Sequence, residues 1–131
     1  MTASKAEFLR AVESFLRSKG AKTRLYKNAL LASIENVPIV FEIDEVEGFL
    51  RISALSEIEV SEEGILRVLL EKNFHYAGIK ISLDPEGFIV ISIEERYECV
   101  ASRMASYVEF AIGKVLRAYG DVSSIAKRNT A

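Results

Sequence analysis

The chain of 131 residues has the length of one domain, and its 50% apolar and 27% charged residues are the balance of a globular protein. A formal net charge of −2 gives no general attraction to nucleic acid or to an anionic membrane, so neither partner is expected. The single cysteine, Cys99, excludes an internal disulfide and cannot build a metal site on its own. With no signal-peptide pattern and no apolar run long enough to span a bilayer, the sequence predicts a cytoplasmic protein.

Amide side chains are scarce in this sequence. It contains no glutamine and four asparagines, while glutamate supplies sixteen of the nineteen acidic residues. Proteins of hot-growing organisms lose thermolabile amides and gain glutamate, so a thermophilic source is one hypothesis and ordinary compositional scatter is the other. A melting temperature below about 60 °C, within the mesophile range, would contradict the first.

The first part of the chain predicts one helix followed by three strands. The helix is expected over Lys5–Lys19, because Ser4 and Glu7 fit a capping box and Gly20 stands where helix-ending glycines occur. Alternating apolar residues between turn signals predict strands over Leu30–Glu35, Pro38–Ile43 and Phe49–Leu55. The segment Lys22–Asn28 either extends the first of these strands or precedes it, and both interpretations stay open.

The segment Ser61–Ile93 predicts a helix followed by a hairpin. The helix is expected over Ser61–Lys72, with Ser61 as its cap and Asn73 ending it in the left-handed conformation. The hairpin is expected to join Ile79–Leu83 to Phe88–Ile93 through the turn Asp84–Gly87, with Gly87 at positive φ.

The last helix is expected over Cys99–Tyr119, because apolar residues recur there at helical spacing on one broad face. Gly120 is expected to stop it. The residues that follow, 121–131, are mostly polar and predict a frayed tail.

The order of elements is helix, three strands, helix, two strands, helix. Short connections favour an α+β fold in a single domain over 1–131, with one antiparallel five-stranded sheet and the helices mainly on one face. This α-β(3)-α-β(2)-α order resembles the type III secretion chaperone-like superfamily, which includes the YbjN-like bacterial proteins. At the residue level, Leu69–Phe74 is similar to the helix end of that family, and Ile79–Ile93 is similar to its hairpin.

The resemblance implies a small, often homodimeric cytoplasmic protein that binds another polypeptide and has no active site and no cofactor. A role in secretion does not follow from it, because nothing in the sequence names a secretion system or a secreted partner.

Two helices carry more apolar surface than one sheet face needs. From Ile65 to Leu70, apolar side chains span an arc of roughly 200°, whereas a one-sided surface helix needs little more than 100°. Either neighbouring helices of the same subunit or a second subunit cover the rest. On the last helix, Phe110 lies off the main stripe near Arg103 and Lys114. Leu66, Leu70 and Phe110 are therefore the candidate dimer or partner contacts, with an edge of the core as the alternative for Phe110.

No motif for catalysis or metal binding is present in the sequence. The only histidine, His75, is expected in a loop, and Cys99 is expected to be a small buried residue rather than a redox site. The clustered glutamates lack the spacing of a calcium loop and are expected to be solvated faces and edges. The basic run Lys22–Lys27 is interpreted as a polar loop rather than as a nucleic-acid patch.

Two functions from different classes fit these observations. The first is a non-enzymatic, homodimeric, chaperone-like module that binds an extended segment of an unidentified partner protein, using sheet edges and apolar patches. The second is a small regulatory domain that senses a metabolite in an internal apolar pocket.

Overall fold

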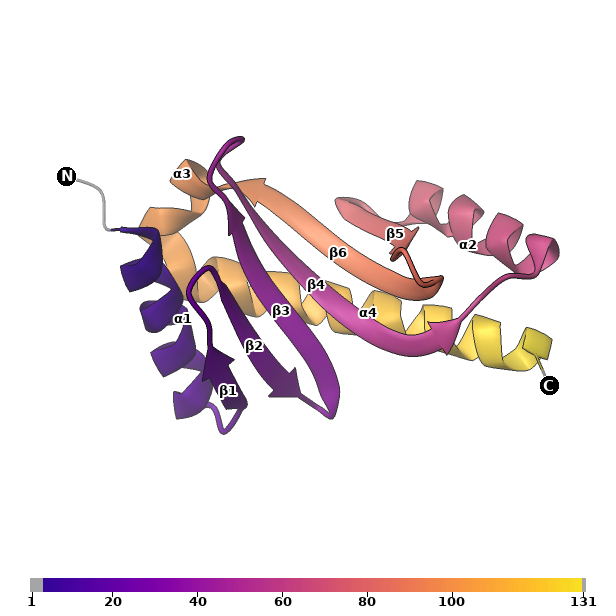
Figure 1. The fold of residues 1–131 in the computed structure, drawn as a ribbon, viewed down its shortest axis with the longest axis horizontal. Coiled ribbons are helices and arrows are strands. Elements are labelled where there is room, and N and C mark those ends of the chain that lie inside the picture. The colour runs from indigo at the N-terminus through magenta and orange to yellow at the C-terminus, as the bar shows by residue number, and fades with distance from the viewer. Residues whose placement is uncertain (1–3, 131) are drawn as a thin grey trace.

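The structure, a computed structural model, describes residues 4–130 and the side chains of residues 4–127. Three main helices and six strands form its framework (Figure 1). In chain order the elements are α1 (Lys5–Ser18), β1 (Lys22–Leu25), β2 (Ala29–Ile34), β3 (Val37–Asp44), β4 (Phe49–Glu59), α2 (Glu63–His75), β5 (Ile79–Leu83), β6 (Phe88–Arg96), a short α3 (Tyr97–Val100), a 3-10 turn η1 (Ala101–Arg103) and α4 (Met104–Thr130).

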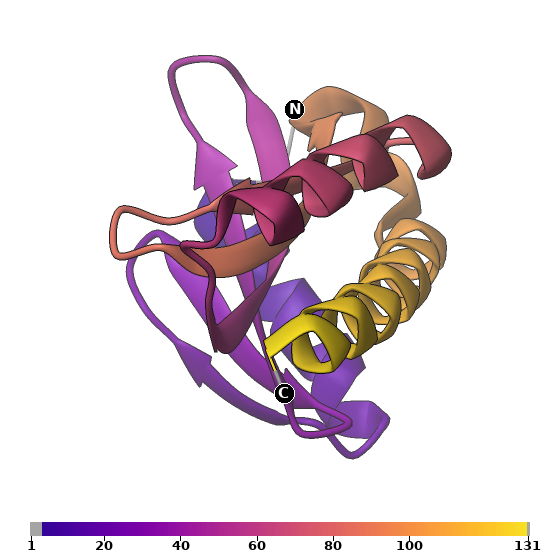
Figure 2. The ribbon, with the colours of Figure 1, turned by 90° about the vertical axis from the view of Figure 1, so that its right-hand side faces the viewer.

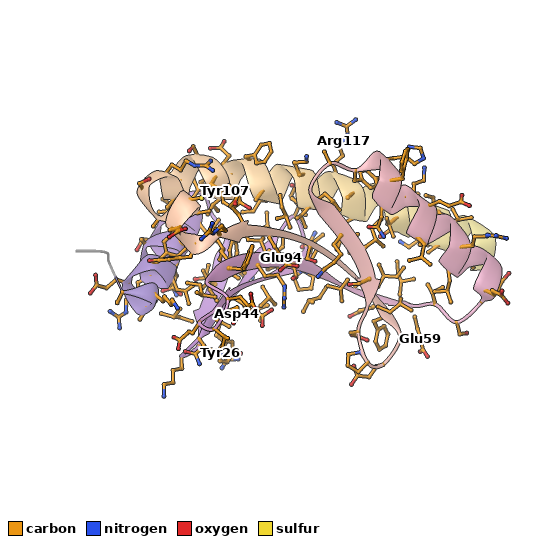
Figure 3. The ribbon with its side chains drawn as sticks, turned by 90° about the horizontal axis from the view of Figure 1, so that it is seen from above. Tyr26, Asp44, Glu59, Glu94, Tyr107 and Arg117 are labelled. Carbon is orange, nitrogen blue, oxygen red and sulfur yellow. The ribbon has the colours of Figure 1, made fainter. Side chains whose placement is uncertain are left out.

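The strands form one antiparallel sheet in the order β1-β2-β3-β4-β6-β5. The helices lie mainly on one face of it, as predicted (Figure 2). Helix α4 runs across β4 and β6, α1 packs on β1 and β2, and α2 packs on β5. In the view from above, α4 lies along one side of the sheet and Tyr26 lies toward the open side (Figure 3). In the strand order of the sheet, β1 and β5 come first and last, so they are the two edge strands.

The strand count is six, so the prediction of a five-stranded sheet is wrong. Lys22–Leu25 forms a strand of its own, which precedes β2 and pairs with it. The polar sequence of this strand gave no apolar alternation, and all but one of its side chains are exposed. A tight turn closes the pair, in which the Tyr26 N–H donates to the Ala29 carbonyl at 2.8 Å.

The core lies between the sheet and the helices. In β3, Ile39, Phe41 and Ile43 share the helix-facing side and are at most 8% exposed, as expected from period-2 alternation. At the first helix, the Glu7 N–H donates to the Ser4 hydroxyl at 3.1 Å, so the predicted cap at Ser4 is confirmed.

The C-terminal helix is longer than predicted. It continues through Gly120 to Thr130, and the prediction of a frayed tail is wrong over the described residues, which end at 130. Val122, Ile125 and Ala126 are buried and continue the apolar stripe of the helix. A mid-helix glycine costs about 1 kcal/mol relative to alanine, less than these side chains gain from burial. At its start, η1 separates α4 from α3, which holds Cys99.

The two ends of α2 also differ from prediction. The helix begins at Glu63, and Glu62 is its N-cap residue. The Glu62 side chain makes no capping hydrogen bond, and Ser61 is not the N-cap that the sequence predicted. At the other end, Asn73 and His75 lie within the helix rather than after it, and the following Gly78 has φ of +77°. The Asn73 side chain instead hydrogen-bonds to the backbone of Ile81 on β5.

The predicted β5–β6 hairpin is confirmed. Gly87 has φ of +90°, the left-handed region in which a residue without Cβ is unstrained. The Asp84 carboxylate accepts the N–H groups of Glu86 and Phe88, both at 2.9 Å, and so fixes the turn.

Candidate partner-binding surfaces

Helix α2 has a buried and an exposed apolar side. Ile65 and Leu69 are each 3% exposed and belong to the core. On the outer side, Leu70 is 66% exposed and Phe74 is 91% exposed. Leu66 is half-buried and packs partly on the core. The two predicted contact leucines are therefore not equivalent, since only Leu70 projects mainly away from the core.

A shallow hollow follows this outer side of α2. Its lining mixes apolar and charged groups, namely Glu63, Gly64, Leu66, Arg67, Leu70 and Glu71. Acidic residues thus stand near both ends of the hollow, with Arg67 between them. An apolar centre with a polar rim is the usual composition of a protein–protein interface.

Strand β1 is held from one side by α1. The Thr23 hydroxyl donates to the Glu13 carboxylate at 2.9 Å and accepts from the Arg17 Nε at 2.7 Å. Arg17 and Glu13 also form an ion pair at 3.6 Å. The Thr23 side chain therefore points to the helix side of the sheet. Because side chains alternate along a strand, Lys22 and Arg24 point to the open face.

The outer edge of β1 is open. The bond from Tyr26 to Ala29 belongs to the same antiparallel ladder as β1 and β2. Hydrogen-bonded and non-bonded pairs alternate in such a ladder. The N–H and C=O groups of Thr23 and Leu25 consequently face outward, and they make no hydrogen bond within the part of the chain that the structure describes.

An apolar hollow lies near the start of β1 but not along its open edge, between α1, α4 and the β2–β3 turn. Its volume is about 270 Å³, and its lining combines apolar side chains with a few charges: Phe15, Leu16, Lys19, Gly20, Ala21, Ser33, Ile34, Glu35, Glu109 and Ile112. Lys19 borders it, with its Nζ 5.1 Å from the centre of the Phe15 ring and 3.8 Å from the Glu109 carboxylate.

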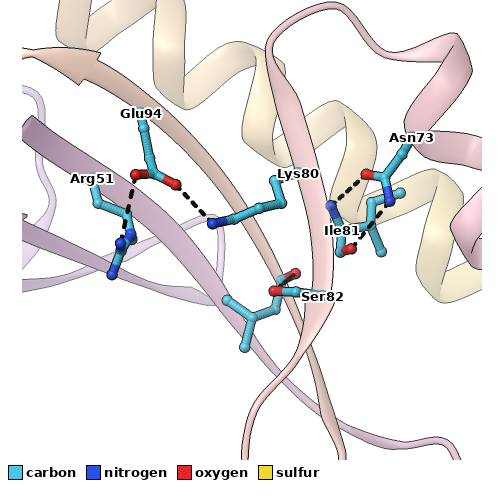
Figure 4. Close-up of polar contacts among 7 residues, drawn as sticks. Arg51, Asn73, Lys80, Ile81, Ser82 and Glu94 are labelled. Atoms are coloured by element: carbon cyan, nitrogen blue, oxygen red, sulfur yellow. Dashed lines mark hydrogen bonds and ion pairs between the residues drawn. The ribbon is translucent and has the colours of Figure 1, made fainter.

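The opposite edge, β5, is closed at its central residue, Ile81, by a side chain of α2. The Asn73 Oδ1 accepts the Ile81 N–H at 2.7 Å, and the Asn73 Nδ2 donates to the Ile81 carbonyl at 3.2 Å (Figure 4). One amide side chain thus satisfies both outward backbone groups of this residue, as a neighbouring strand would do.

The open face of the sheet carries a row of alternating charges. Glu94 on β6 bonds Lys80 on β5 at 2.8 Å and pairs with Arg51 on β4 at 3.5 Å (Figure 4). The hydrogen bond from Lys80 is the main cause that lowers the pKa of the Glu94 carboxyl. From the sequence, Glu94 belongs to the clustered glutamates that are expected to be solvated. Its ion-pair partners could not be predicted, because the pairing of β4 with β6 brings together residues that are far apart in the chain.

Phe110 is 57% exposed on α4, and the Lys114 Nζ lies 5.4 Å from the centre of its ring. Arg103 stacks instead on Tyr107, at 5.5 Å from that ring's centre. The exposure of Phe110 agrees with its selection from the sequence, and its role as a contact stays a prediction.

Tyr107 is buried, its hydroxyl finds no partner within the described residues, and burial raises its pKa to about 12.

The residues considered for chemistry stand in separate elements. His75 is the exposed last residue of α2, not a loop residue. Cys99 is an exposed residue of α3, so its predicted burial is wrong. Over the described residues, no group of three or more histidine, cysteine and acidic side chains is arranged to hold a metal ion. Among them, too, no helix combines the length and apolar character needed to cross a membrane.

Comparison with known proteins identifies the fold. No protein-family model and no curated protein matches the sequence. One chain of the HopA1–SchA chaperone–effector complex superposes with a TM-score of 0.63 at 15% identity, over 88% of this chain and 93% of that one. The chain has the type III secretion chaperone-like fold.

Two further solved structures support the same fold. A chain of the ExsC–ExsE complex gives a TM-score of 0.61 at 16% identity, covering 86% of this chain and 88% of that one. A chain of the heterodimeric ExoU–SpcU complex, from the type III secretion system of Pseudomonas aeruginosa, gives 0.55 at 16% identity, covering 88% and 95%. The resemblance seen in the sequence is thus confirmed for the architecture.

Proposed function

We propose that this protein is a non-enzymatic, homodimeric, chaperone-like module of the cytoplasm that binds an extended segment of another polypeptide. The observation that carries the proposal is the open β1 edge, whose outward N–H and C=O groups have no partner among the described residues. The fold adds support, because one of the similar structures is by name a chaperone–effector complex. The exposed free thiol of Cys99 fits a reducing compartment such as the cytoplasm.

Binding would use strand addition. An extended segment laid along β1 pairs with the outward N–H and C=O groups of Thr23 and Leu25, which gives affinity independent of sequence. Alternate side chains of the segment then point to the helix side, where they lie against α1 and beside the exposed Leu25 of β1.

Dimerisation would use the outer side of α2. When two copies of this helix pack antiparallel about a two-fold axis, Leu66 meets Leu70 of the partner subunit, and the reciprocal contact forms as well. The exposed Phe74 extends the same apolar strip. Covering the strip removes apolar surface from water, and Phe110 on α4 remains a further candidate contact for the dimer or the partner.

The metabolite-sensing alternative has one candidate site, the same hollow beside β1. At about 270 Å³ it is slightly smaller than typical small-molecule pockets of roughly 300–1,000 Å³.

Selection from a randomised peptide display library tests the binding function. Selected peptides should bind the purified full-length chain, and N-methylation of alternate backbone amides on the pairing side should abolish binding, because strand addition needs those donors. The variant Leu25→Pro removes one outward N–H of β1 and should weaken binding, whereas the matched Leu25→Val retains it. Selected peptides that tolerate N-methylation in both registers would contradict strand addition.

A further inference from the structure

The charge of the chain is strongly asymmetric around β1. Between Glu13 and Glu35 there are five cationic residues and no acidic one, although the whole chain has a net charge of −2. These cations come from the end of α1, from β1 and from the turn after it: Arg17, Lys19, Lys22, Arg24 and Lys27. The open edge is therefore a basic site on an otherwise acidic protein.

Three of these cations are uncompensated. Arg17 and Lys19 have carboxylate partners, Glu13 and Glu109. In contrast, Lys22, Arg24 and Lys27 are exposed and take part in none of the ion pairs of the described residues. Their charges remain available to a bound molecule.

The geometry of β1 separates charge from apolar surface. Lys22 and Arg24 are two residues apart and point to the open face, whereas Thr23 points to α1 and the apolar hollow lies on that same helix side. A strand added to this edge continues the same alternation. Its side chains on the open face stand beside two cations, and those on the other face stand beside Thr23, Leu25 and α1.

We propose that β1 selects extended segments in which acidic and apolar residues alternate. This inference rests on the proposed function and adds the chemistry of the partner to it. Glutamate or aspartate on the open face pairs with Lys22 and Arg24 across the strands, and the apolar residues on the helix side lie beside the exposed Leu25. The closed β5 edge does not compete, because Asn73 already occupies the backbone groups of Ile81.

A single-stranded nucleic acid is the other polyanion that a basic strand could attract. Two observations favour the polypeptide. A strand edge offers alternating donors and acceptors, which a peptide backbone matches and a phosphate backbone, which only accepts, does not. Tyr26 is half exposed, but Arg24 lies 5.9 Å from the centre of its ring, where a base would stack.

Three synthetic peptides of equal length test the inference, with valine alternating with glutamate, with lysine or with threonine. Fluorescence anisotropy against the full-length chain should show tightest binding to the valine–glutamate peptide, with affinity falling as sodium chloride is raised. The double variant Lys22→Glu/Arg24→Glu should lower that affinity by about tenfold and reverse the preference toward the lysine peptide. The matched variant Arg10→Glu, on the exposed surface of α1, should leave the preference unchanged.

The outcomes distinguish this inference from the proposed polypeptide-binding function on which it rests. Equal, N-methylation-sensitive binding of all three peptides would overturn the acidic preference and leave the polypeptide-binding function standing. Failure of these peptides and of every displayed peptide would overturn both. A short oligothymidylate that binds more tightly than the glutamate peptide and displaces it would overturn the inference in favour of nucleic acid.

Discussion

At one end of the sheet, α2 binds the backbone of the edge strand β5, whereas at the other end α1 binds only a side chain of the edge strand β1. Asn73 satisfies the N–H and C=O of Ile81, while Glu13 and Arg17 hold the hydroxyl of Thr23. Both helices anchor a strand, but only the first anchor closes an edge. Exposed edges recruit other strands, so the choice of which backbone groups a helix satisfies decides where a polypeptide can add.

The largest effect is expected at α2, beside the closed edge, because apolar side chains on the outer side of this helix are exposed in the single subunit. Leu70→Glu should dissociate the dimer at a cost of several kcal/mol, because a charge cannot be buried unpaired. Leu66→Glu should do the same and also lower the stability of the subunit, since Leu66 packs partly on the core. Sedimentation equilibrium combined with denaturant unfolding separates the two effects, with Arg10→Ala on the exposed side of α1 as control. A parent protein that is monomeric at micromolar concentration would refute the proposed dimer.

Opening the closed edge is expected to have the next largest effect. Asn73→Ala leaves the N–H and C=O of Ile81 without their partners, which should cost about 2 kcal/mol in unfolding free energy. Asn73→Asp keeps the acceptor for the Ile81 N–H but turns a carboxylate oxygen toward the Ile81 carbonyl, so it should not restore the parent stability. Hydrogen exchange at Ile81 should accelerate in the alanine variant and not in exposed controls such as Glu71→Ala. If exchange at Ile81 is unchanged, the edge is closed by something other than this amide.

The contrast between the edges was only partly predictable from sequence. Local chemistry determined the positive φ of Gly87 and the cap at Ser4, and both were correctly predicted. Asn73 resembled a helix end because asparagine tolerates the left-handed region, but its side chain has a tertiary partner eight residues away. Strand β1 lacked apolar alternation, because an edge strand that projects cations to one face has nothing there to bury.

The candidate site was predictable to a similar degree. The excess apolar arc of α2 leaves Leu70 66% exposed, and the role of Leu70 as a contact stays a prediction. The hollow beside β1 was not predicted, since Phe15, Ile34 and Ile112 come from three elements that meet only in the folded chain. The basic run near Lys22 was visible in the sequence. Because strand β1 was not predicted, nothing indicated that these cations lie at an open sheet edge.

A smaller effect is expected from the charged row on the open face, which links β5 to the centre of the sheet. The pKa of Glu94 is lowered in the folded state, so the carboxylate contributes stability that is present above its ordinary pKa of 4.5 and is lost as the pH falls through the folded value. Because the group is partly exposed, the contribution should stay below about 1 kcal/mol. Urea unfolding of the parent and of Glu94→Gln at neutral and acidic pH should converge in acid. A constant difference between them would show that the ion pairs add nothing.

The smallest effects are expected where the sequence offers reactive groups without a site. Catalysis needs a nucleophile or base held by a second group, and His75 and Cys99 are exposed residues of separate helices. His75→Ala and Cys99→Ser should each leave unfolding free energy within about 1 kcal/mol of the parent. Neither residue lines the hollow beside β1, so peptide affinity should also be unchanged. Loss of peptide binding in Cys99→Ser, with folding intact, would instead place part of the partner surface at α3, far along the chain from the open edge.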